Sequence, residues 1–310
     1  MISELLSATV LIGILTSGIR LATPYLYAAI GETFGQLSGV LNLGVDGMML
    51  MGAYAAFFVA FTSGSLWLGL LAAVVVGAIM GLAMAFISVT LQAEQGISGI
   101  GVFLFGLGMS ELLFQKTLGT VETVKGFAPL DIPLLSDIPV LGEILFQHNI
   151  MVYLAYLLVP LSWFIINKTT LGLKIRAVGE SPAAADSLGV SVAQVRYVTV
   201  TVGGILAAVA GASLSIALLN VFQQNLTNGL GFIAVALVYF GGWRPLGVLF
   251  GSLIFSMVNA LQVWVQVLGI PVPSDIAVMM PYALTIIVLV FTARRATQPT
   301  ALTKPYERGG

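Results

Sequence analysis

Long uninterrupted runs of apolar side chains make up most of this sequence, and the charged side chains are confined to short stretches between them. Residues 48–93 contain no charged side chain, and neither do residues 197–243. A helix needs about 20 residues to cross the hydrocarbon core of a bilayer. Both runs exceed 40 residues, so each is long enough to cross twice, which predicts a protein with many membrane spans.

The backbone of these spans is predicted to be helical. Hydrocarbon offers no hydrogen-bond partner to backbone amides, so only helices and closed barrels cross it. The Leu, Val and Ala runs lack the short-period alternation of a barrel strand. We therefore expect an all-α, polytopic transmembrane helical bundle that includes broken helices. The nine candidate spans are residues 5–30, 44–61, 66–91, 97–116, 150–167, 196–219, 230–242, 246–268 and 276–293.

The first span has an alternative reading. Arg20 and Pro24 interrupt it, and glycines recur at Gly31, Gly35 and Gly39. A four-residue repeat of glycine is typical of closely packed membrane helices. Residues 21–43 could therefore form a span of their own, which would make ten spans and place the N-terminus inside the cell. Nine spans place it outside.

Composition excludes several classes of protein. Of all residues, 58% are hydrophobic and 8% are charged, with a mean hydropathy of +1.04, whereas about a quarter of a soluble domain is charged. The chain has no cysteine and one histidine, His148, so we predict no metal site. It has no G-x-x-x-x-G-K-[ST] sequence to cradle ATP phosphates. We also expect no catalytic residues, no bound cofactor and no nucleic acid partner.

Basic residues predict the orientation, because they concentrate on the cytoplasmic side of membrane proteins. If residues 168–195 are cytoplasmic, alternation of the later spans puts nine of the twelve basic residues inside and leaves Arg20 undecided. Only Lys116 and Lys125 then lie outside. The nine inside are Lys168, Lys174, Arg176, Arg196, Arg244, Arg294, Arg295, Lys304 and Arg308.

We interpret residues 1–310 as a single transmembrane domain with three polar segments. Residues 117–149 form an external loop, which Pro129, Pro133 and Pro139 prevent from being one continuous helix. It is either a solvated loop or a docking face. Residues 168–195 form a cytoplasmic loop, and residues 297–310 are expected to be a disordered cytoplasmic tail.

The loop 168–195 contains a short helix with both ends marked. Ser181 can cap its free amides, Pro182 suits the first helical position, and Gly189 can adopt the left-handed conformation past the last turn. Three consecutive alanines give it a surface that another backbone can approach closely. The helix suits docking into a partner's groove; the alternative is an ordinary solvated loop. The residues assigned to this element are Glu180, Ser181, Pro182, Ala183, Ala184, Ala185, Asp186 and Gly189.

Four stretches resemble one family, the permease subunits of bacterial ABC importers for branched-chain amino acids, simple sugars and nucleosides. RAVGESPAAADSLGVS (176–191) resembles the family's coupling loop. GVLNLGVDGMMLMGAY (39–54) and GFIAVALVYFGGWRPLGVLFGSL (231–253) resemble its N-terminal and C-terminal signatures. IPVPSDIAVMMPYALTIIVLVF (270–291) is more similar to the nucleoside and simple-sugar branch than to the amino-acid branch.

This resemblance implies a set of partners. The short helix at 180–189 would fit into a separate cytoplasmic ATPase, which would use ATP and Mg. A second permease subunit, identical or related, would complete the solute path, and an external substrate-binding protein would deliver the solute. The resemblance also implies a multi-pass protein of the bacterial cytoplasmic (inner) membrane.

The most informative intramembrane polar residues are Asn42 and Asp46. They are four residues apart and share a helical face, while Gly44 and Gly47 weaken the helix there. A carboxylate inside a membrane usually faces a cavity or the protein interior, so these four residues are predicted to line or gate the solute path at a broken helix. The alternative is that Asp46 lies at the membrane edge and caps the following helix.

Three further residues are weaker candidates for the path. Glu111 lies deep in a span, shares a face with Gln115 and is expected to turn toward the protein interior, where it could relay protons with Asp46. Asn220 and Gln224 belong to an amide-rich external turn that could bind a hydroxylated solute or could simply be a wet hairpin.

We therefore predict a permease subunit of an ATP-driven importer that moves a nucleoside or simple sugar by alternating access. The alternative is an ion-coupled secondary transporter that works without an ATPase and depends on Asp46 or Glu111. A passive channel is disfavoured, because no ring-forming filter motif occurs.

Overall fold

The computed structural model describes residues 7–269 and 298–307, together with isolated residues between 273 and 290. Seven helices in this part of the chain are long and apolar enough to cross a membrane. They confirm the all-α polytopic bundle. The candidate span 276–293 lies almost entirely outside the described residues.

The long helices follow the predicted spans closely. They are α2 (Ala8–Leu37), α3 (Val45–Ser63), α4 (Leu66–Ala85) with the π-turn η1 (Phe86–Thr90), α5 (Gln95–Thr117), α7 (Ile150–Lys168), α10 (Val192–Ser213) with η2 (Leu214–Leu218), and α12 (Pro245–Val267). A shorter apolar helix, α11 (Leu230–Phe240), precedes α12.

The N-terminal region forms one helix and not two. α2 has 30 residues and continues through Pro24, which corresponds to about 45 Å at 1.5 Å per residue. The ten-span alternative, with residues 21–43 as a separate span, is therefore wrong. Gly31 packs against the backbone of Gly203 in α10, so this glycine allows α2 and α10 to approach each other closely.

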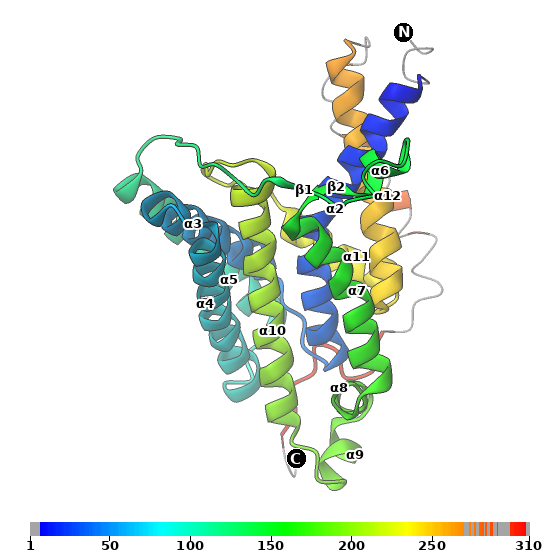
Figure 1. Ribbon diagram of the computed structural model, residues 1–310. Helices are drawn as coiled ribbons and strands as arrows, with labels where there is room; N and C mark the ends of the chain where they lie inside the picture. Colours follow the sequence, from blue (N-terminus) through cyan, green and yellow to red (C-terminus); the bar gives the residue numbers. More distant parts are fainter. Residues whose placement is uncertain are drawn as a thin grey trace.

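α10 is the central helix of the bundle and packs on α2, α3 and α4 (Figure 1). Small residues permit this packing. A methyl group added at Gly77 of α4 would come 2.6 Å from the Gly204 carbonyl oxygen, and one added at Gly204 would come equally close to the Gly77 carbonyl oxygen. The high glycine content of the sequence thus reflects helices in backbone contact.

The two polar loops lie at opposite ends of the bundle. The end shown at the top of Figure 1 carries α6 (Leu141–Leu145) and the antiparallel pair β1 (Pro129–Asp131) and β2 (Gln147–Asn149). α8 (Thr170–Glu180) and α9 (Pro182–Ser187) lie at the opposite end. α2 begins at the end that carries α6. This agrees with the nine-span prediction, which places the N-terminus on the same side as the external loop. We refer to the α9 end as cytoplasmic and to the α6 end as external, following the positive-inside pattern.

The C-terminal segment 298–307, here called the C-terminal strap, is packed and not disordered. Ala301 and Leu302 are each 5% exposed. The Ala301 amide donates to the Gly179 carbonyl oxygen at 2.8 Å, and the Thr303 amide donates to the Gly39 carbonyl oxygen at 3.2 Å. The expectation of a disordered tail is wrong for these residues, because their partners are distant turns of the chain that a local polar sequence does not reveal.

Candidate functional site

The short helix predicted in the cytoplasmic loop is α9, and it begins and ends as expected. Pro182 is its first residue, and Gly189 has a φ of +83° beyond its end. The Gly189 amide donates to the Asp186 carbonyl oxygen at 2.9 Å, and the Val190 amide donates to that of Ala185 at 3.0 Å. These bonds satisfy the last carbonyls of the helix.

One predicted contact of this helix is wrong. The Ser181 side chain makes no capping hydrogen bond. Ser181 also ends α8, and its amide donates to the Ala177 carbonyl oxygen at 2.9 Å. Ser181 is therefore both the last flanking residue of α8 and the first flanking residue of α9, and its backbone conformation must suit both helices.

The helix α8, which precedes α9, was not predicted. The Thr169 hydroxyl accepts from the Gly172 amide at 3.2 Å and caps the start of α8. Ile175 and Val178 are buried on one face. A capping threonine followed by apolar residues three apart is a readable helix signal. α8 ends at Glu180, whose carboxylate accepts from the Thr300 hydroxyl of the strap at 2.9 Å.

The surface of α9 is small and partly apolar. Ala183 and Ala184 are exposed and Ala185 is buried against the bundle. Leu188, just past the helix, is 85% exposed, although the sequence analysis did not single it out. We call α8, α9 and Leu188 the coupling element.

Asp46 forms a second site inside the bundle. It lies in the first turn of α3 and is 1% exposed. Its carboxylate accepts from the Thr227 hydroxyl at 3.0 Å and from the Gly231 amide at 2.8 Å. Because Gly231 is in the first turn of α11, this one carboxylate lies at the start of two helices. An anion is stabilised at such helix N-termini.

Neighbouring residues hold the start of α3 in place. The Asn42 side-chain oxygen accepts from the Gly44 amide at 2.9 Å, and Gly44 is the N-cap residue directly before α3. Gly47 lies against the backbone of Phe103 in α5, so a larger side chain would collide there. The structure thus gathers Asn42, Gly44, Asp46 and Gly47 at a break in the helical structure. Asp46 is buried within the first turn of α3, whose N-cap is Gly44, so the alternative in which Asp46 caps that helix is wrong.

Glu32 extends this polar cluster toward the cytoplasmic end and was not assigned a role from the sequence. Its carboxylate accepts from the Asn42 amide at 2.9 Å and from the Gln36 side chain at 3.1 Å. Gln36 in turn accepts from the indole N–H of Trp243 at 2.8 Å. We call Glu32, Gln36, Asn42, Asp46 and Thr227 the buried node.

α3 and α11 leave the node toward opposite ends of the bundle. Along α3, the Tyr54 hydroxyl lies 2.9 Å from that of Thr117, where α5 ends next to the external loop. α11 leads to Trp243, which bonds Gln36 near the cytoplasmic turn. Two helices that start inside the bundle and diverge are typical of solute sites in transporters.

The remaining candidates do not join the node. Glu111 is partly exposed on α5, where its carboxylate accepts from the Gln115 side chain at 3.3 Å, so the expectation that it turns inward is not confirmed. The Asn220 carbonyl oxygen accepts from the Val124 amide of the external loop at 3.0 Å, and Gln224 is exposed. Thr227, on the same segment, reaches Asp46, a contact that no local pattern indicates.

Comparison with known proteins identifies the family. A family model described as the branched-chain amino acid transport system / permease component matches residues 14–289. The chain belongs to this permease family. Among its relatives is a permease protein of a Haloferax volcanii ABC transporter named for glucose, TsgC13, which is 36% identical over 96% of this chain and 98% of the relative.

Two relatives come from one organism. The guanosine ABC transporter permease protein NupQ of Bacillus subtilis is 36% identical over 93% of this chain and 94% of its own length. A second guanosine ABC transporter permease protein of that organism, NupP, is 26% identical over 89% of this chain and 79% of its own length. No solved structure matches this permease. Family membership and the seven apolar helices show a multi-pass membrane transport subunit.

Proposed function

We propose that this permease is the membrane-spanning subunit of an ATP-driven importer for a nucleoside or a simple sugar, in a bacterial cytoplasmic membrane. The observation that carries the proposal is the 36% identity to a guanosine permease over 93% of the chain. The relative named for glucose keeps simple sugars in the substrate class. ATP and Mg²⁺ would be used by a separate ATPase, because this sequence has no phosphate-cradling loop.

The coupling element is the proposed docking site for the ATPase. Ala183 and Ala184 offer little side-chain bulk, and Leu188 projects from the cytoplasmic end of the bundle with 85% of its surface exposed. An exposed leucine beside a small-residue surface fits an apolar groove of a partner. ATP-driven closure of the partner would displace this element first.

The C-terminal strap gives that displacement a physical route to the buried node. Its Thr300 and Ala301 bond Glu180 and Gly179 at the end of α8, and its Thr303 bonds Gly39. Gly39 lies in the turn that leads to Asn42 and α3. A shift of the coupling element would therefore pull on the start of α3, and we propose that separation of α3 from α11 at Asp46 opens the solute path.

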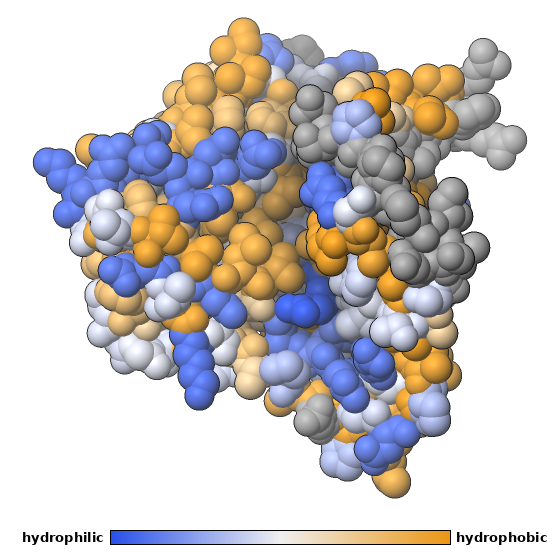
Figure 2. All heavy atoms as spheres, turned by 90° about the horizontal axis from the view of Figure 1, so that it is seen from above, coloured by the Kyte–Doolittle hydropathy of each residue, from blue (hydrophilic) through white to orange (hydrophobic). Residues whose placement is uncertain are grey.

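Two further partners follow from surfaces of the chain. Glu111 is half-exposed on α5 beside exposed Leu104 and Leu112. A carboxylate is costly against lipid, so this face suits a second permease subunit, as the NupP and NupQ pair also suggests. The face seen in Figure 2 mixes polar and apolar side chains, and external-loop residues such as Leu134 are up to 83% exposed. This surface suits a substrate-binding protein.

The test is uptake by membrane vesicles that contain this permease and its co-purifying partners. A panel of radiolabelled guanosine, other nucleosides, glucose and leucine would be offered with and without ATP. We expect ATP-dependent accumulation of a nucleoside or a sugar and none of leucine. Accumulation by the purified permease alone, driven by a proton gradient and abolished by Asp46→Asn, would instead support the ion-coupled alternative.

A further inference from the structure

A cavity of about 260 Å³ lies next to the buried node. Its wall is made by α2, α11, α12 and the short segment that leads into α11, and it includes the node residue Thr227. α12 packs on both α2 and α11, so these helices meet around the cavity (Figure 1). The volume is close to the lower limit of small-molecule sites, about 300 Å³.

Two carboxamide side chains of α12 line this cavity. Asn259 and Gln262 are both partly exposed, and their spacing of three residues puts them on one helical face. Asn259 lies about 21 Å along α12 from Pro245, at 1.5 Å per residue, which is inside a hydrocarbon core of about 30 Å. Neither side chain has a hydrogen-bond partner among the described residues. A polar side chain within a span usually bonds a neighbouring helix or faces a cavity, and these two face the cavity.

Asn228 adds a third carboxamide from a different element. It lies in the turn directly before α11, with a left-handed φ of +43° that asparagine adopts more readily than most residues. Its amide donates to the Asn225 carbonyl oxygen at 3.0 Å, which holds the turn. Its side chain is exposed and makes no hydrogen bond within the part of the chain that the structure describes. We call the space lined by Asn228, Asn259 and Gln262 the carboxamide cavity.

Buried side chains form the floor of the carboxamide cavity. Tyr25 and Phe255 meet edge to face with ring centroids 5.1 Å apart. Thr227 is completely buried beside them, and its hydroxyl donates to the Asp46 carboxylate at 3.0 Å. A solute in this cavity would therefore contact the carboxamides directly, with only Thr227 between it and the junction of α3 and α11 at Asp46.

The chemistry of the wall selects a neutral solute. None of its described residues has a charged side chain. A free amino acid carries an ammonium and a carboxylate, and each would lose water here without gaining an ion partner. A carboxamide has one acceptor oxygen and two N–H donors, so it can bond two neighbouring hydroxyl groups at once. Neighbouring hydroxyls on a ring are the feature that ribonucleosides and simple sugars share.

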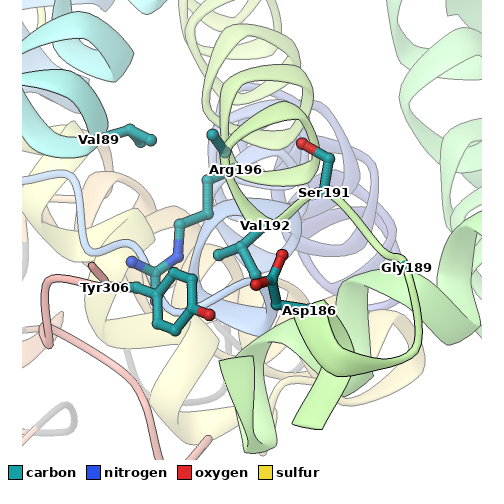
Figure 3. A pocket seen from close by; sticks show the side chains of 8 residues that line it. Val89, Asp186, Gly189, Ser191, Val192, Arg196 and Tyr306 are labelled. Atoms are coloured by element: carbon teal, nitrogen blue, oxygen red, sulfur yellow. The ribbon is translucent and has the colours of Figure 1, made fainter. Parts of the chain in front are cut away.

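A larger cavity, of about 360 Å³, lies beside the coupling element and differs in character (Figure 3). Charged side chains line it, among them Asp186 and Arg196. Arg196 is 1% exposed, and its Nε and Nη1 donate to the carbonyl oxygens of Ser38 and Lys304, both at 3.1 Å. This arginine holds the C-terminal strap in place. The carboxamide cavity, with its unbonded amides inside a span, is therefore the better candidate for a solute site.

We propose that the carboxamide cavity binds the imported solute through neighbouring hydroxyls of its sugar ring, which Asn228, Asn259 and Gln262 contact. This inference rests on the proposed function, because it takes the imported solute to be a nucleoside or a simple sugar. The fully buried Thr227 then connects the occupied cavity to Asp46, where α3 and α11 separate to open the path.

Saturation-transfer NMR titration of the full-length permease in lipid nanodiscs tests the ligand class without any transport. The probes are inosine and glucose, each compared with its 2-deoxy and 3-deoxy analogues on the sugar ring, and leucine is the charged control. We expect inosine or glucose to bind with a Kd below about 1 mM, and about tenfold or more tighter than at least one of its deoxy analogues. Equal binding of all analogues, equally tight binding of leucine, or no binding of either probe at this concentration would overturn the proposal.

A matched pair of variants locates the site. Asn259→Leu removes one carboxamide and keeps an apolar membrane helix, and we expect it to weaken binding about tenfold or more. Gln266→Leu makes the same kind of change at an exposed position one turn further along α12, outside the cavity wall, and should retain binding. Unchanged binding by Asn259→Leu would contradict the proposal.

Two further readouts separate this inference from its alternatives. If the carboxamides bond a second permease subunit instead, Asn259→Leu would split the permease pair on size-exclusion chromatography and leave solute binding unchanged. ATP-dependent uptake that Asn259→Leu leaves unchanged would defeat the solute site but not the proposed function. Wild-type binding of inosine or glucose without ATP-dependent uptake would defeat the proposed function and leave the site in place.

Discussion

The coupling element and the buried node differ in almost every physical respect. The coupling element has an exposed outer surface at Ala183, Ala184 and Leu188, so changes on that surface leave the bundle intact. The node is buried, and its side chains bond residues from α2, α3, α11 and the turn before α12. Substitutions on the coupling element can therefore change partner recognition without unfolding the protein. Substitutions in the buried node should affect both stability and transport.

The largest effect is expected from Asp46→Ala. The change leaves the Thr227 hydroxyl and the Gly231 amide without an acceptor inside the bundle, which costs about 2–5 kcal/mol of folding free energy. The measurement is thermal unfolding of the purified protein in detergent, together with uptake. Asp46→Asn, which keeps one acceptor oxygen, should lose less stability. An Asp46→Ala variant as stable as the wild type would contradict the claim that the buried node stabilises the protein.

Ala184→Glu should reduce uptake without reducing stability, in contrast to Asp46→Ala. A charged side chain on the exposed face of α9 should reduce ATP-dependent uptake about tenfold or more by disturbing the docking surface, with thermal unfolding unchanged. Gly189→Val should also abolish uptake, because a β-branched residue is strained at a φ of +83°. The control Gln194→Glu adds the same charge on nearby α10. Wild-type uptake by Ala184→Glu would contradict docking through α9.

A smaller effect is expected in the strap, which lies between the two regions. Leu302 is 5% exposed, and Leu302→Ala should cost about 2 kcal/mol of strap packing. We expect faster proteolysis of the C-terminus and partial loss of uptake. Lys304→Ala, which keeps the backbone carbonyl that Arg196 contacts, is the matched control. Equal proteolysis of the two variants would mean that the strap is not held by its apolar contacts.

The smallest effect concerns the external loop. Burial lowers the pKa of His148, with a smaller opposing effect from its 2.8 Å contact with the Ile144 carbonyl oxygen. A histidine whose folded pKa lies below its ordinary value of about 6.5 favours folding when neutral, so this stability falls as pH drops below that value. Thermal unfolding between about pH 7.5 and pH 5.5 should show a small acid destabilisation. His148→Gln should reduce it; an identical pH profile would exclude the histidine.

The sequence predicted α9, one part of the coupling element, because the signals of this helix are local. Pro182, Gly189 and the three alanines fall within one short segment, and each acts on the backbone around it. The break near Asn42 and Asp46 was predicted for the same reason, from neighbouring glycines. The spans were predicted because a bilayer imposes long apolar runs on any helix that crosses it.

The contacts that complete the node were not predictable in this way. Asp46 and Gly231 are 185 residues apart, and Trp243 and Gln36 are 207 apart. No periodicity or turn signal relates such pairs. The strap was expected to be disordered for the same reason, since its order comes from Gly39, Gly179 and Arg196.

Single cysteines test most directly whether a cytoplasmic ATPase engages this permease at α9. The chain has no native cysteine, so Leu188→Cys and Leu134→Cys, at positions 85% and 83% exposed, each carry one thiol at opposite ends of the bundle. We expect a thiol cross-linker to join the Leu188→Cys variant to the co-purifying ATPase. A membrane-impermeant reagent should label only the Leu134→Cys variant in intact cells. Labelling of the Leu188→Cys variant from outside, or cross-linking of the ATPase to the Leu134→Cys variant, would contradict the account.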